Sequence, residues 1–399
     1  MNKKKVLFIM PSMFIGGAER SLLGLLDSFD YDRYDVDLFL YRHEGEFLNL
    51  IPDNVRVLPE KKQYKTFDVP ISGLLKSSLF AFGFSRIIGK ISQKLHSIVS
   101  KEPSGVWMSM QYISKSLQWL LPKIEGKYDC AVSFLGIPDV LLNKVNADVK
   151  IAWNHTDYTI LNPNHKYDRK LYSKLDYIAS VSENCTKQFL SVYPEFEEKA
   201  ITVENILSER ILNKQAEEKV SDFEGNEIRL LSIGRFSYAK NFDNVPEICK
   251  IIKNSVLNVK WYLIGYGGDE PIIREKIKEY GMENDVIILG KKVNPYPYIK
   301  ACDLYVQPSR YEGKCVTVRE AQILHKPVVI TNYATSGSQL TDGFDGVVVP
   351  MDNQGCAEGI IKVLNDEELM KTLSENTKKV DYTNSKEVEK IYAFINSFK

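Results

Sequence analysis

Two basic residues stand five positions apart in the segment Gly234-Arg235-Phe-Ser-Tyr-Ala-Lys240, directly after the apolar run 229–233. Arginine offers a planar fork of donors and lysine a compact positive charge, so the pair could hold a diphosphate without a metal ion. Taken alone, the same spacing more often marks two solvated surface cations. A diphosphate site is therefore a hypothesis that depends on what the neighbouring residues can bind.

Two carboxylates, Glu312 and Glu320, stand eight positions apart after the apolar run 304–307. If a loop at 310–315 leads into a helix near Val316, the first carboxylate lies on the loop and the second in the opening turns of the helix. Both would then face the carboxyl ends of the strands, where open α/β sheets bind ligands. Carboxylates accept hydrogen bonds from sugar hydroxyls, but such a spacing also arises by chance, so its meaning depends on context.

Glycines follow two of the apolar runs, as Gly16-Gly17 after residues 6–10 and as Gly265-Tyr-Gly267 after residues 260–264. Glycine lets the backbone approach a ligand closely, and a helix that starts at such a loop offers unpaired N–H groups to an anion or a hydroxyl-rich molecule. A plain tight turn would use the same residues. The first pair does not fit G-x-G-x-x-G and no acidic residue ends a second strand, so NAD is not indicated.

Short apolar runs alternate with longer amphipathic segments in both halves of the chain. Runs such as Val328-Val-Ile330 are continuously apolar, which is typical of strands covered on both faces of a sheet, and helical patterns such as 271–280 lie between them. This βαβ rhythm predicts an α/β protein of two Rossmann-like domains with parallel sheets. The predicted strands are 6–10, 36–41, 130–134, 151–154, 177–181, 229–233, 260–264, 286–289, 304–307, 328–331 and 346–349.

The boundary between the domains is predicted near Asn205, because the charged residues 206–227 contain no clear strand and precede a fresh one. Near the end of the chain, apolar residues from Val388 to Ile395 follow helical spacing. The prediction is an N-terminal acceptor-binding domain, a C-terminal nucleotide-binding domain and a terminal helix that packs back on the first domain, with the bounds 1–205, 206–380 and 381–399.

The chain has 399 residues, with 52 Lys and Arg against 52 Asp and Glu, so its formal net charge is zero. A dedicated nucleic-acid binder would carry a basic surplus, and we expect no nucleic-acid partner. The six cysteines show no C-x-x-C spacing, which indicates reduced thiols rather than a zinc site or a disulfide frame. The first apolar run stops at Pro11, too short for a signal peptide, and no run approaches the roughly 18 residues of a membrane span. The expected location is the cytoplasm.

Taken in order, these motifs resemble the large retaining glycosyltransferase family four, whose members have the GT-B fold of two Rossmann-like domains facing across a cleft. The resemblance covers almost the whole chain, weakly over 60–127 and strongly over 229–350. Its motifs are Gly16-Gly17-Ala-Glu-Arg20, Trp153-Asn-His155-Thr-Asp157, Ser180-Val-Ser-Glu183, Glu204-Asn205, Gly234-Arg235 with Lys240, Gly265-x-Gly267, and Glu312-x7-Glu320 followed by Lys326-Pro-Val.

The resemblance implies a nucleotide sugar as co-substrate and assigns residues to its nucleotide. Arg235 and Lys240 would hold the donor diphosphate and stabilise the charge on the departing nucleotide. Glu320 would bind the ribose hydroxyls, and the segment Lys292–Val293 would meet the base through its backbone.

The resemblance also assigns residues to the transferred sugar. Glu312 would bind hydroxyls of the donor sugar, assisted by backbone N–H groups of Gly313-Lys314-Cys315-Val316. His155 would lie beside the sugar in the interdomain cleft. The glycines implied to line the site are Gly16 and Gly17, from the N-terminal domain, and Gly234 and Gly265.

The implied reaction is transfer with retention, in which the acceptor hydroxyl approaches from the front side and a donor phosphate oxygen takes its proton. Positioning and stabilisation of the leaving diphosphate drive such a reaction, so no metal, no resident cofactor and no protein nucleophile is expected. The donor would be a UDP-hexose or UDP-N-acetylhexosamine, and the acceptor a glycan or lipid-linked intermediate of surface or capsular polysaccharide. A protein side chain as the acceptor and a non-catalytic GT-B partner subunit are the alternatives.

Three positions depart from the usual family pattern. Asn241 stands where glycine is common, His325 stands where a small residue usually precedes Lys-Pro, and Lys314-Cys315 replaces an aromatic-small pair. These departures leave the nucleotide site intact and leave the identity of the donor sugar open.

One further motif, Asp35-Val-Asp37, matches the D-x-D that binds a metal in the other glycosyltransferase fold. It stands at the start of the predicted strand 36–41 rather than at a strand end beside a nucleotide, so we expect no metal there.

The segment 61–127 carries eleven Lys and Arg against three Asp and Glu, a net charge of +8. We favour a domain helix whose apolar stripe faces the core, and the alternative is an interfacial helix on an anionic membrane, near a lipid-linked acceptor. The net charge supports weak peripheral contact with the inner face of the membrane. The residues of the stripe are Phe84, Ile87, Ile88, Ile91, Leu95 and Ile98.

Overall fold

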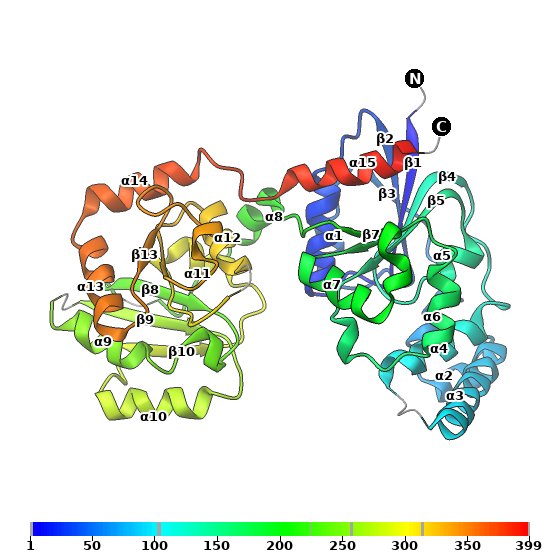
Figure 1. The fold of residues 1–399 in the computed structure, drawn as a ribbon, viewed down its shortest axis with the longest axis horizontal. Coiled ribbons are helices and arrows are strands. Elements are labelled where there is room, and N and C mark those ends of the chain that lie inside the picture. The colour runs from blue at the N-terminus through cyan, green and yellow to red at the C-terminus, as the bar shows by residue number, and fades with distance from the viewer. Residues whose placement is uncertain (1–2, 102–104, 224, 256–257, 313–314, 398–399) are drawn as a thin grey trace. The chain divides into compact units, whose positions relative to one another are not determined.

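The computed structural model describes residues 3–101, 105–223, 225–255, 258–312 and 315–397. The chain forms two compact units (Figure 1). The N-terminal unit comprises Met1–Leu207 together with Asn384–Lys399, and the C-terminal unit comprises Ser208–Thr383. The chain therefore passes between the units twice.

The N-terminal unit is built on a parallel sheet of seven strands in the order β3-β2-β1-β4-β5-β6-β7. In the centre of the sheet, Phe8 of β1 pairs with Leu38 of β2 and with Val132 of β4. Helices cover both faces of such a sheet, so its central strands are continuously apolar. The strands are β1 (Lys4–Met10), β2 (Tyr34–Leu40), β3 (Val55–Val57), β4 (Lys127–Ser133), β5 (Asn146–Asn154), β6 (Tyr177–Ser180) and β7 (Ala200–Thr202).

The helices of this unit include one from the C-terminal end of the chain, α15. Tyr392 of α15 stacks on Tyr34 of β2 with ring centroids 4.6 Å apart, and its hydroxyl accepts a hydrogen bond of 2.6 Å from the backbone N–H of Asp30. Ile391 and Ile395 of the same helix are also buried. The helices are α1 (Gly17–Asp27), α2 (Ile71–Leu75), α3 (Phe80–Ser100), α4 (Val106–Leu117), α5 (Asp139–Lys144), α6 (His165–Tyr172), α7 (Glu183–Val192) and α15 (Val388–Ser397).

The C-terminal unit has a parallel sheet of six strands in the order β10-β9-β8-β11-β12-β13. The order of connection reverses between β8 and β11, which is the topological switch point of a doubly wound sheet. The strands are β8 (Ile228–Ile233), β9 (Val259–Ile264), β10 (Val286–Gly290), β11 (Leu304–Gln307), β12 (Val328–Thr331) and β13 (Val347–Val349). The helices are α8 (Glu209–Gln215), α9 (Val245–Lys253), α10 (Glu270–Tyr280), α11 (Tyr296–Ala301), α12 (Val316–Ile323), α13 (Asn353–Leu364) and α14 (Glu367–Thr377).

The apolar stripe of α3 faces outward, so the interpretation favoured from the sequence, a stripe that faces the core, is wrong. The side that packs on the unit carries Phe82, Ser85, Arg86 and Gly89. Helical spacing identifies a stripe, but it does not identify the medium that the stripe faces. No helix in the described ranges is long and apolar enough to cross a lipid bilayer. The outward residues, each between 54% and 64% exposed, are Phe84, Ile88, Ile91, Leu95 and Ile98.

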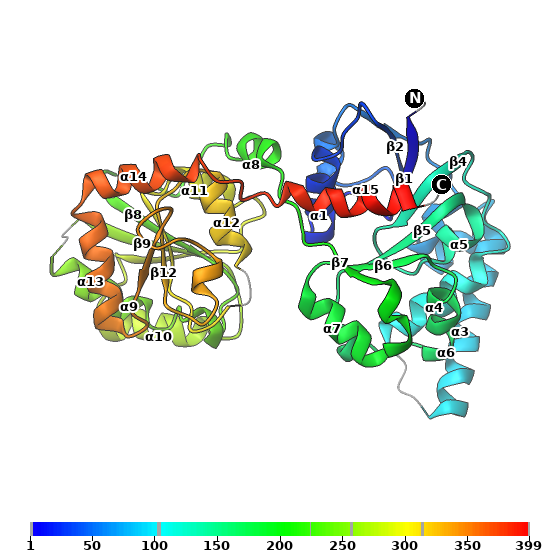
Figure 2. The same cartoon turned by 45° about the horizontal axis from the view of Figure 1, so that its top comes forward.

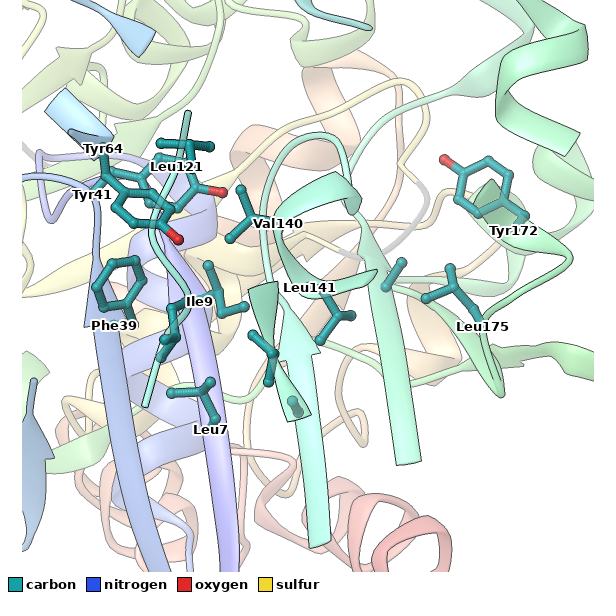
Figure 3. Packing of buried hydrophobic residues seen from close by; sticks show 14 of the residues in the cluster. Leu7, Ile9, Phe39, Tyr41, Tyr64, Leu121, Val140, Leu141, Tyr172 and Leu175 are labelled. Atoms are coloured by element: carbon teal, nitrogen blue, oxygen red, sulfur yellow. The ribbon is translucent and has the colours of Figure 1, made fainter. Parts of the chain in front are cut away.

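The core of the N-terminal unit lies between its sheet and the helices that cover it. Figure 3 shows Ile9 of β1 and Phe39 of β2 in the same cluster as Val140 and Leu141 of α5. Tyr172 of α6 belongs to the same buried cluster. The core therefore joins strands and helices that are distant in the sequence.

A buried carboxylate, Asp168, lies in α6 beside this core and is 1% exposed. It accepts hydrogen bonds from Gln111 Nε2 at 2.6 Å and from the hydroxyl of Tyr193 at 2.9 Å. Burial raises the pKa of Asp168 to about 7, although these hydrogen bonds oppose the shift. The folded protein therefore keeps a proton on Asp168 at pH values where the unfolded chain has released it.

This raised pKa predicts a pH dependence of stability. Between about pH 4 and pH 7 the native state binds more protons than the unfolded state at this site, so the Asp168 contribution to stability falls as pH rises. Asp168→Asn should remove that contribution, which amounts to a few kcal/mol at most. We expect the unfolding free energy of Asp168→Asn, measured by urea titration, to decline less over this range than that of the unmodified protein.

The matched control is Asp148→Asn, which changes a carboxylate that is 45% exposed in its ion pair with Lys127. This control should follow the pH profile of the unmodified protein. Parallel profiles for the unmodified protein and Asp168→Asn would contradict the assignment.

Candidate active site

The carboxyl edge of the C-terminal sheet brings together a cation and a carboxylate. Lys240 ends a 3₁₀ turn (Tyr238–Lys240) that follows β8, and Glu312 lies in the loop that follows β11. Lys240 Nζ lies 2.6 Å from Glu312 Oε1, and the hydroxyl of Ser309 donates to the same oxygen at 2.6 Å. The two side chains are 18% and 12% exposed, so the pair is largely shielded from water.

Two further contacts join the loops that carry this ion pair. Asn241 adopts the left-handed conformation, with φ of 60°, and its side-chain amide donates to Pro308 O at 2.9 Å. Arg310 forms a bidentate ion pair with Asp243, with N–O distances of 2.8 and 2.7 Å, and lies over the ring of Tyr238. These side chains hold the loop after β11 against the loop after β8.

Asn241 stands where the family usually has glycine, and the backbone conformation of Asn241 explains this difference. Asparagine tolerates the left-handed region better than most residues, so it can occupy the position where glycine is common. Unlike glycine, it also supplies the hydrogen bond to Pro308 O. The sequence did not predict a role for Asp243 or Arg310, because they lie 67 positions apart and only the fold shows that they pair. It did not predict a role for Ser309 either.

The second predicted carboxylate, Glu320, lies in the opening turns of α12 and is 4% exposed. It accepts a hydrogen bond from the hydroxyl of Tyr296 at 2.8 Å. The helix begins at Val316, where the sequence placed it. The two carboxylates thus occupy the loop and the helix that the spacing predicted.

Cys315 precedes α12 and is held by the side-chain amide of Gln339. Its backbone N–H donates to Gln339 Oε1 at 2.8 Å, and Gln339 Nε2 donates to Cys315 O at 3.2 Å. Burial raises the pKa of the Cys315 thiol, so it stays protonated although Lys240 Nζ lies 3.8 Å from its sulfur. Gly313 and Lys314, predicted for the same segment, lie outside the described residues.

The glycines after β8 and β9 are explained by close packing of the two loops. A Cβ on Gly265, whose φ is 155°, would lie 1.9 Å from Gly234 O, and a Cβ on Gly267 would lie 2.2 Å from Phe236 O. Larger residues would push the loops apart. Packing within the unit is therefore sufficient reason for both glycines.

The remaining predicted residues of this unit lie at its surface or in ion pairs. Arg235 is exposed, and its guanidinium has no hydrogen bond or ion pair within the described part of the chain. Lys292 pairs with Asp222 at 2.9 Å, and Val293 is 56% exposed. Among the three predicted site cations that the structure describes, Arg235, Lys240 and Lys292, Arg235 is therefore the one whose charge is not already paired with a carboxylate.

In the N-terminal unit, His155 follows β5 and is largely buried beside Phe134, with ring centroids 4.9 Å apart. Burial lowers the pKa of His155 to about 4, so the imidazole is neutral at physiological pH. Its Nε2 is buried and lacks a hydrogen-bond partner among the described residues.

Three residues near His155 also have a buried side-chain atom without a hydrogen-bond partner among the described residues. Trp153 Nε1, Asn154 Nδ2 and Ser180 Oγ are buried at the carboxyl ends of β5 and β6, without hydrogen-bond partners in the described ranges. Buried polar atoms are normally paired, and such a group calls for an explanation. The sequence showed their motifs but gave no reason to select these three atoms.

The predicted glycines of the N-terminal unit lie at the start of α1. Gly16 caps the helix with φ of −162°, and a Cβ there would lie 2.2 Å from Glu19 Oε2. Gly17 is the first helical residue, and a Cβ there would meet nothing within 4 Å. The Glu19 side chain is flexible and could move aside, so packing within the unit requires neither Gly16 nor Gly17 to be glycine.

The D-x-D motif lies in β2, and Asp37 has protein partners. Its carboxylate accepts hydrogen bonds from Arg56 at 2.8 and 2.5 Å and from the hydroxyl of Tyr128 at 2.9 Å. Among the residues that the structure describes, no three His, Cys, Asp or Glu side chains are grouped to hold a metal ion.

Residues 213–380 match the family model described as glycosyl transferases group 1. An uncharacterized glycosyltransferase of Methanocaldococcus jannaschii is 26% identical over 223 residues, which cover 51% of this chain and 54% of that protein. The capsular polysaccharide biosynthesis glycosyltransferase CapM of Staphylococcus aureus is 30% identical over 169 residues, which cover 42% and 44%. A Campylobacter jejuni enzyme, named as a 4-α-N-acetylgalactosaminyltransferase for a diphospho-undecaprenol-linked sugar, is 27% identical over 151 residues, which cover 37% and 40%. The chain thus spans about half the length of these curated relatives, or less.

Solved structures align with almost the whole chain. HepE of Anabaena, in complex with UDP, has a TM-score of 0.56 at 17% identity and covers 99% of this chain and 100% of its own. TarM of S. aureus, in complex with fondaparinux, α-GlcNAc-glycerol and UDP, has a TM-score of 0.59 at 14% identity with the same coverage. At such low sequence identity, the structural similarity establishes the fold alone. The chain therefore has the GT-B fold of two Rossmann-like units, and its residues 213–380 are similar to the glycosyl transferases group 1 family.

Proposed function

We propose that the chain is a retaining, metal-independent glycosyltransferase. It moves a hexose or N-acetylhexosamine from a UDP-sugar to a glycan acceptor, namely a lipid-linked intermediate of surface polysaccharide. The observation that carries the proposal is the pair formed by Lys240 and Glu312 at the switch point of the C-terminal sheet, within the residues that match the family model. A cation beside a carboxylate suits a ligand that joins a diphosphate to a hydroxyl-rich sugar.

The two side chains keep capacity to bind such a ligand while they contact each other. An ammonium group has three N–H donors and a carboxylate has two acceptor oxygens, and the contacts at Glu312 concern Oε1. Lys240 would donate to the diphosphate and Glu312 would accept from hydroxyls of the sugar. Arg235 would reach the diphosphate from the surface, and Glu320 would accept from the ribose.

In the proposed reaction, the bond between the anomeric carbon and the diphosphate oxygen breaks while a bond to the acceptor oxygen forms. The acceptor proton moves to an oxygen of the leaving diphosphate. Lys240 and Arg235 lower the barrier because they stabilise the charge that develops on that group. The neutral imidazole of His155 would donate or accept a hydrogen bond beside the sugar without adding charge.

The choice of acceptor is supported by the names of the relatives. CapM acts in capsular polysaccharide biosynthesis, and the name of the C. jejuni enzyme specifies an undecaprenol-linked acceptor and an α-linkage. An α-linked product is what retention yields from an α-linked donor. UDP is supported as the nucleotide by its presence with HepE and TarM.

Removal of either member of the central pair should abolish transfer. We expect Lys240→Ala and Glu312→Ala each to lower kcat/KM by roughly 100-fold or more, because each loses a group that stabilises the transition state. The measurement is the rate of UDP release from the donor in the presence of acceptor.

The matched control is Lys253→Ala, which breaks the ion pair with Asp285 elsewhere in the C-terminal unit. That pair is shielded to a similar degree, with side chains 26% and 17% exposed. The control should keep most of the activity. Near-normal turnover in Lys240→Ala or Glu312→Ala would refute the site, provided that circular dichroism shows the variant folded.

The donor nucleotide can be identified by thermal stabilisation. Because a ligand that binds only the folded state raises the midpoint of unfolding, we expect UDP and its hexose conjugates to raise Tm, and ADP and GDP to raise it less. The shift should persist in the presence of EDTA, since two cations supply the charge that a metal would provide. A larger shift with another nucleoside diphosphate would contradict UDP as the donor nucleotide.

A further inference from the structure

The outer face of α3 carries a ridge of large apolar side chains. In Figures 1 and 2, α3 lies beside α4 at the edge of the N-terminal unit, away from its sheet. Successive ridge residues are three or four positions apart, so they form one line along a helix of 21 residues, about 30 Å long. The ridge residues, each between 54% and 64% exposed, are Phe80, Phe84, Ile88, Ile91, Leu95 and Ile98.

The buried face of α3, opposite the ridge, carries Phe82 together with small or polar residues. Ser85 donates to Ser116 O at 2.5 Å, and the guanidinium of Arg86 donates to Thr66 O at 2.8 Å. At Gly89, a Cβ would lie 2.9 Å from Tyr112 O, so the backbones are close. A surface helix of a globular protein normally places its apolar stripe inward, whereas the long apolar stripe of α3 faces outward.

The charged side chains of residues 69–101, which include α3, all have the same sign. Residues 69–101 contain no Asp or Glu, so nothing in this stretch neutralises its cations. Lys90 and Lys94 are exposed, and neither has an ion-pair partner in the part of the chain that the structure describes. At about 100° per residue, both lie on the same flank of the ridge. The five cations of the stretch are Lys76, Arg86, Lys90, Lys94 and Lys101.

We propose that α3 binds the surface of a bilayer that contains anionic lipid, lying in the plane of the membrane. The ridge enters the boundary between headgroups and acyl chains, and Lys90 and Lys94 extend their stems so that the ammonium groups meet lipid phosphates. An apolar ridge flanked by unpaired cations fits this partner in both chemistry and charge. This proposal of membrane binding does not depend on the proposed glycosyltransferase activity.

A second copy of the chain fits the ridge less well. The spacing from Phe84 to Ile98 matches only two heptads, whereas a stable coiled coil needs three or four. Two such helices would bring Lys94 near the lysines of the other copy, and neither α3 has an acid to neutralise them. A bilayer supplies the missing negative charge.

The test is co-sedimentation of the full chain with vesicles, without any nucleotide sugar. We expect binding to vesicles of equal parts phosphatidylcholine and phosphatidylglycerol, and roughly tenfold weaker partition to pure phosphatidylcholine. The double variant Ile88→Ser with Ile91→Ser should lose binding about tenfold or more. Both residues are more than half exposed, so the fold should survive. Lys90→Gln with Lys94→Gln should weaken binding to the anionic vesicles and reduce its salt dependence.

The matched control is Ile272→Ser, because Ile272 of α10 is 48% exposed on the other unit. It should bind as the unmodified protein does. The proposal is overturned if the unmodified chain ignores anionic vesicles, or if the ridge variant binds them equally well. It is also overturned if sedimentation equilibrium shows a dimer that the ridge variant dissociates. Sugar transfer with a soluble acceptor, measured in the ridge variant, separates failure of this proposal from failure of the proposed function.

Discussion

The ion pair between Lys240 and Glu312 joins the loops that follow β8 and β11, at the switch point of the C-terminal sheet. Charge attraction alone would not hold the two loops in one arrangement, because the long side chains of a lysine and a glutamate can reach many partners. The geometry holds because Asn241 bonds to Pro308 O and Arg310 pairs with Asp243. The proposed diphosphate and sugar contacts depend on this arrangement, because they require the cation and the carboxylate to stay adjacent.

Much of the fold could be predicted from the sequence, because buried parallel strands leave continuous apolar runs that periodicity detects. The start of α12 and the place of Glu320 followed from the same reasoning. Pairings across the sheet could not be predicted, since Lys240 and Glu312 lie 72 positions apart. Nor could the sequence show that Ser180 Oγ is buried without a partner in the described ranges, because that depends on what surrounds the end of β6.

The outward stripe of α3 marks the limit of sequence patterns most clearly. The helical spacing of Phe84, Ile88 and Ile91 is the same whether these side chains face a protein core or lipid. The sequence therefore led to the wrong prediction that the stripe faces the core, as it does in most surface helices. The deciding observation is the exposure of these side chains, while Phe82, Arg86 and Gly89 occupy the buried face. Neutrality of the whole chain likewise concealed a stretch without acids around this helix.

The proposed function requires that the cation and carboxylate at the switch point bind a UDP-sugar. A crystal structure of the full chain with a non-hydrolysable UDP-hexose analogue tests it most directly. We expect diphosphate density within hydrogen-bond distance of Lys240 and Arg235, with sugar hydroxyls at Glu312. Nucleotide density elsewhere on the chain, or at this edge without contact to Lys240 or Glu312, would rule out the proposed site.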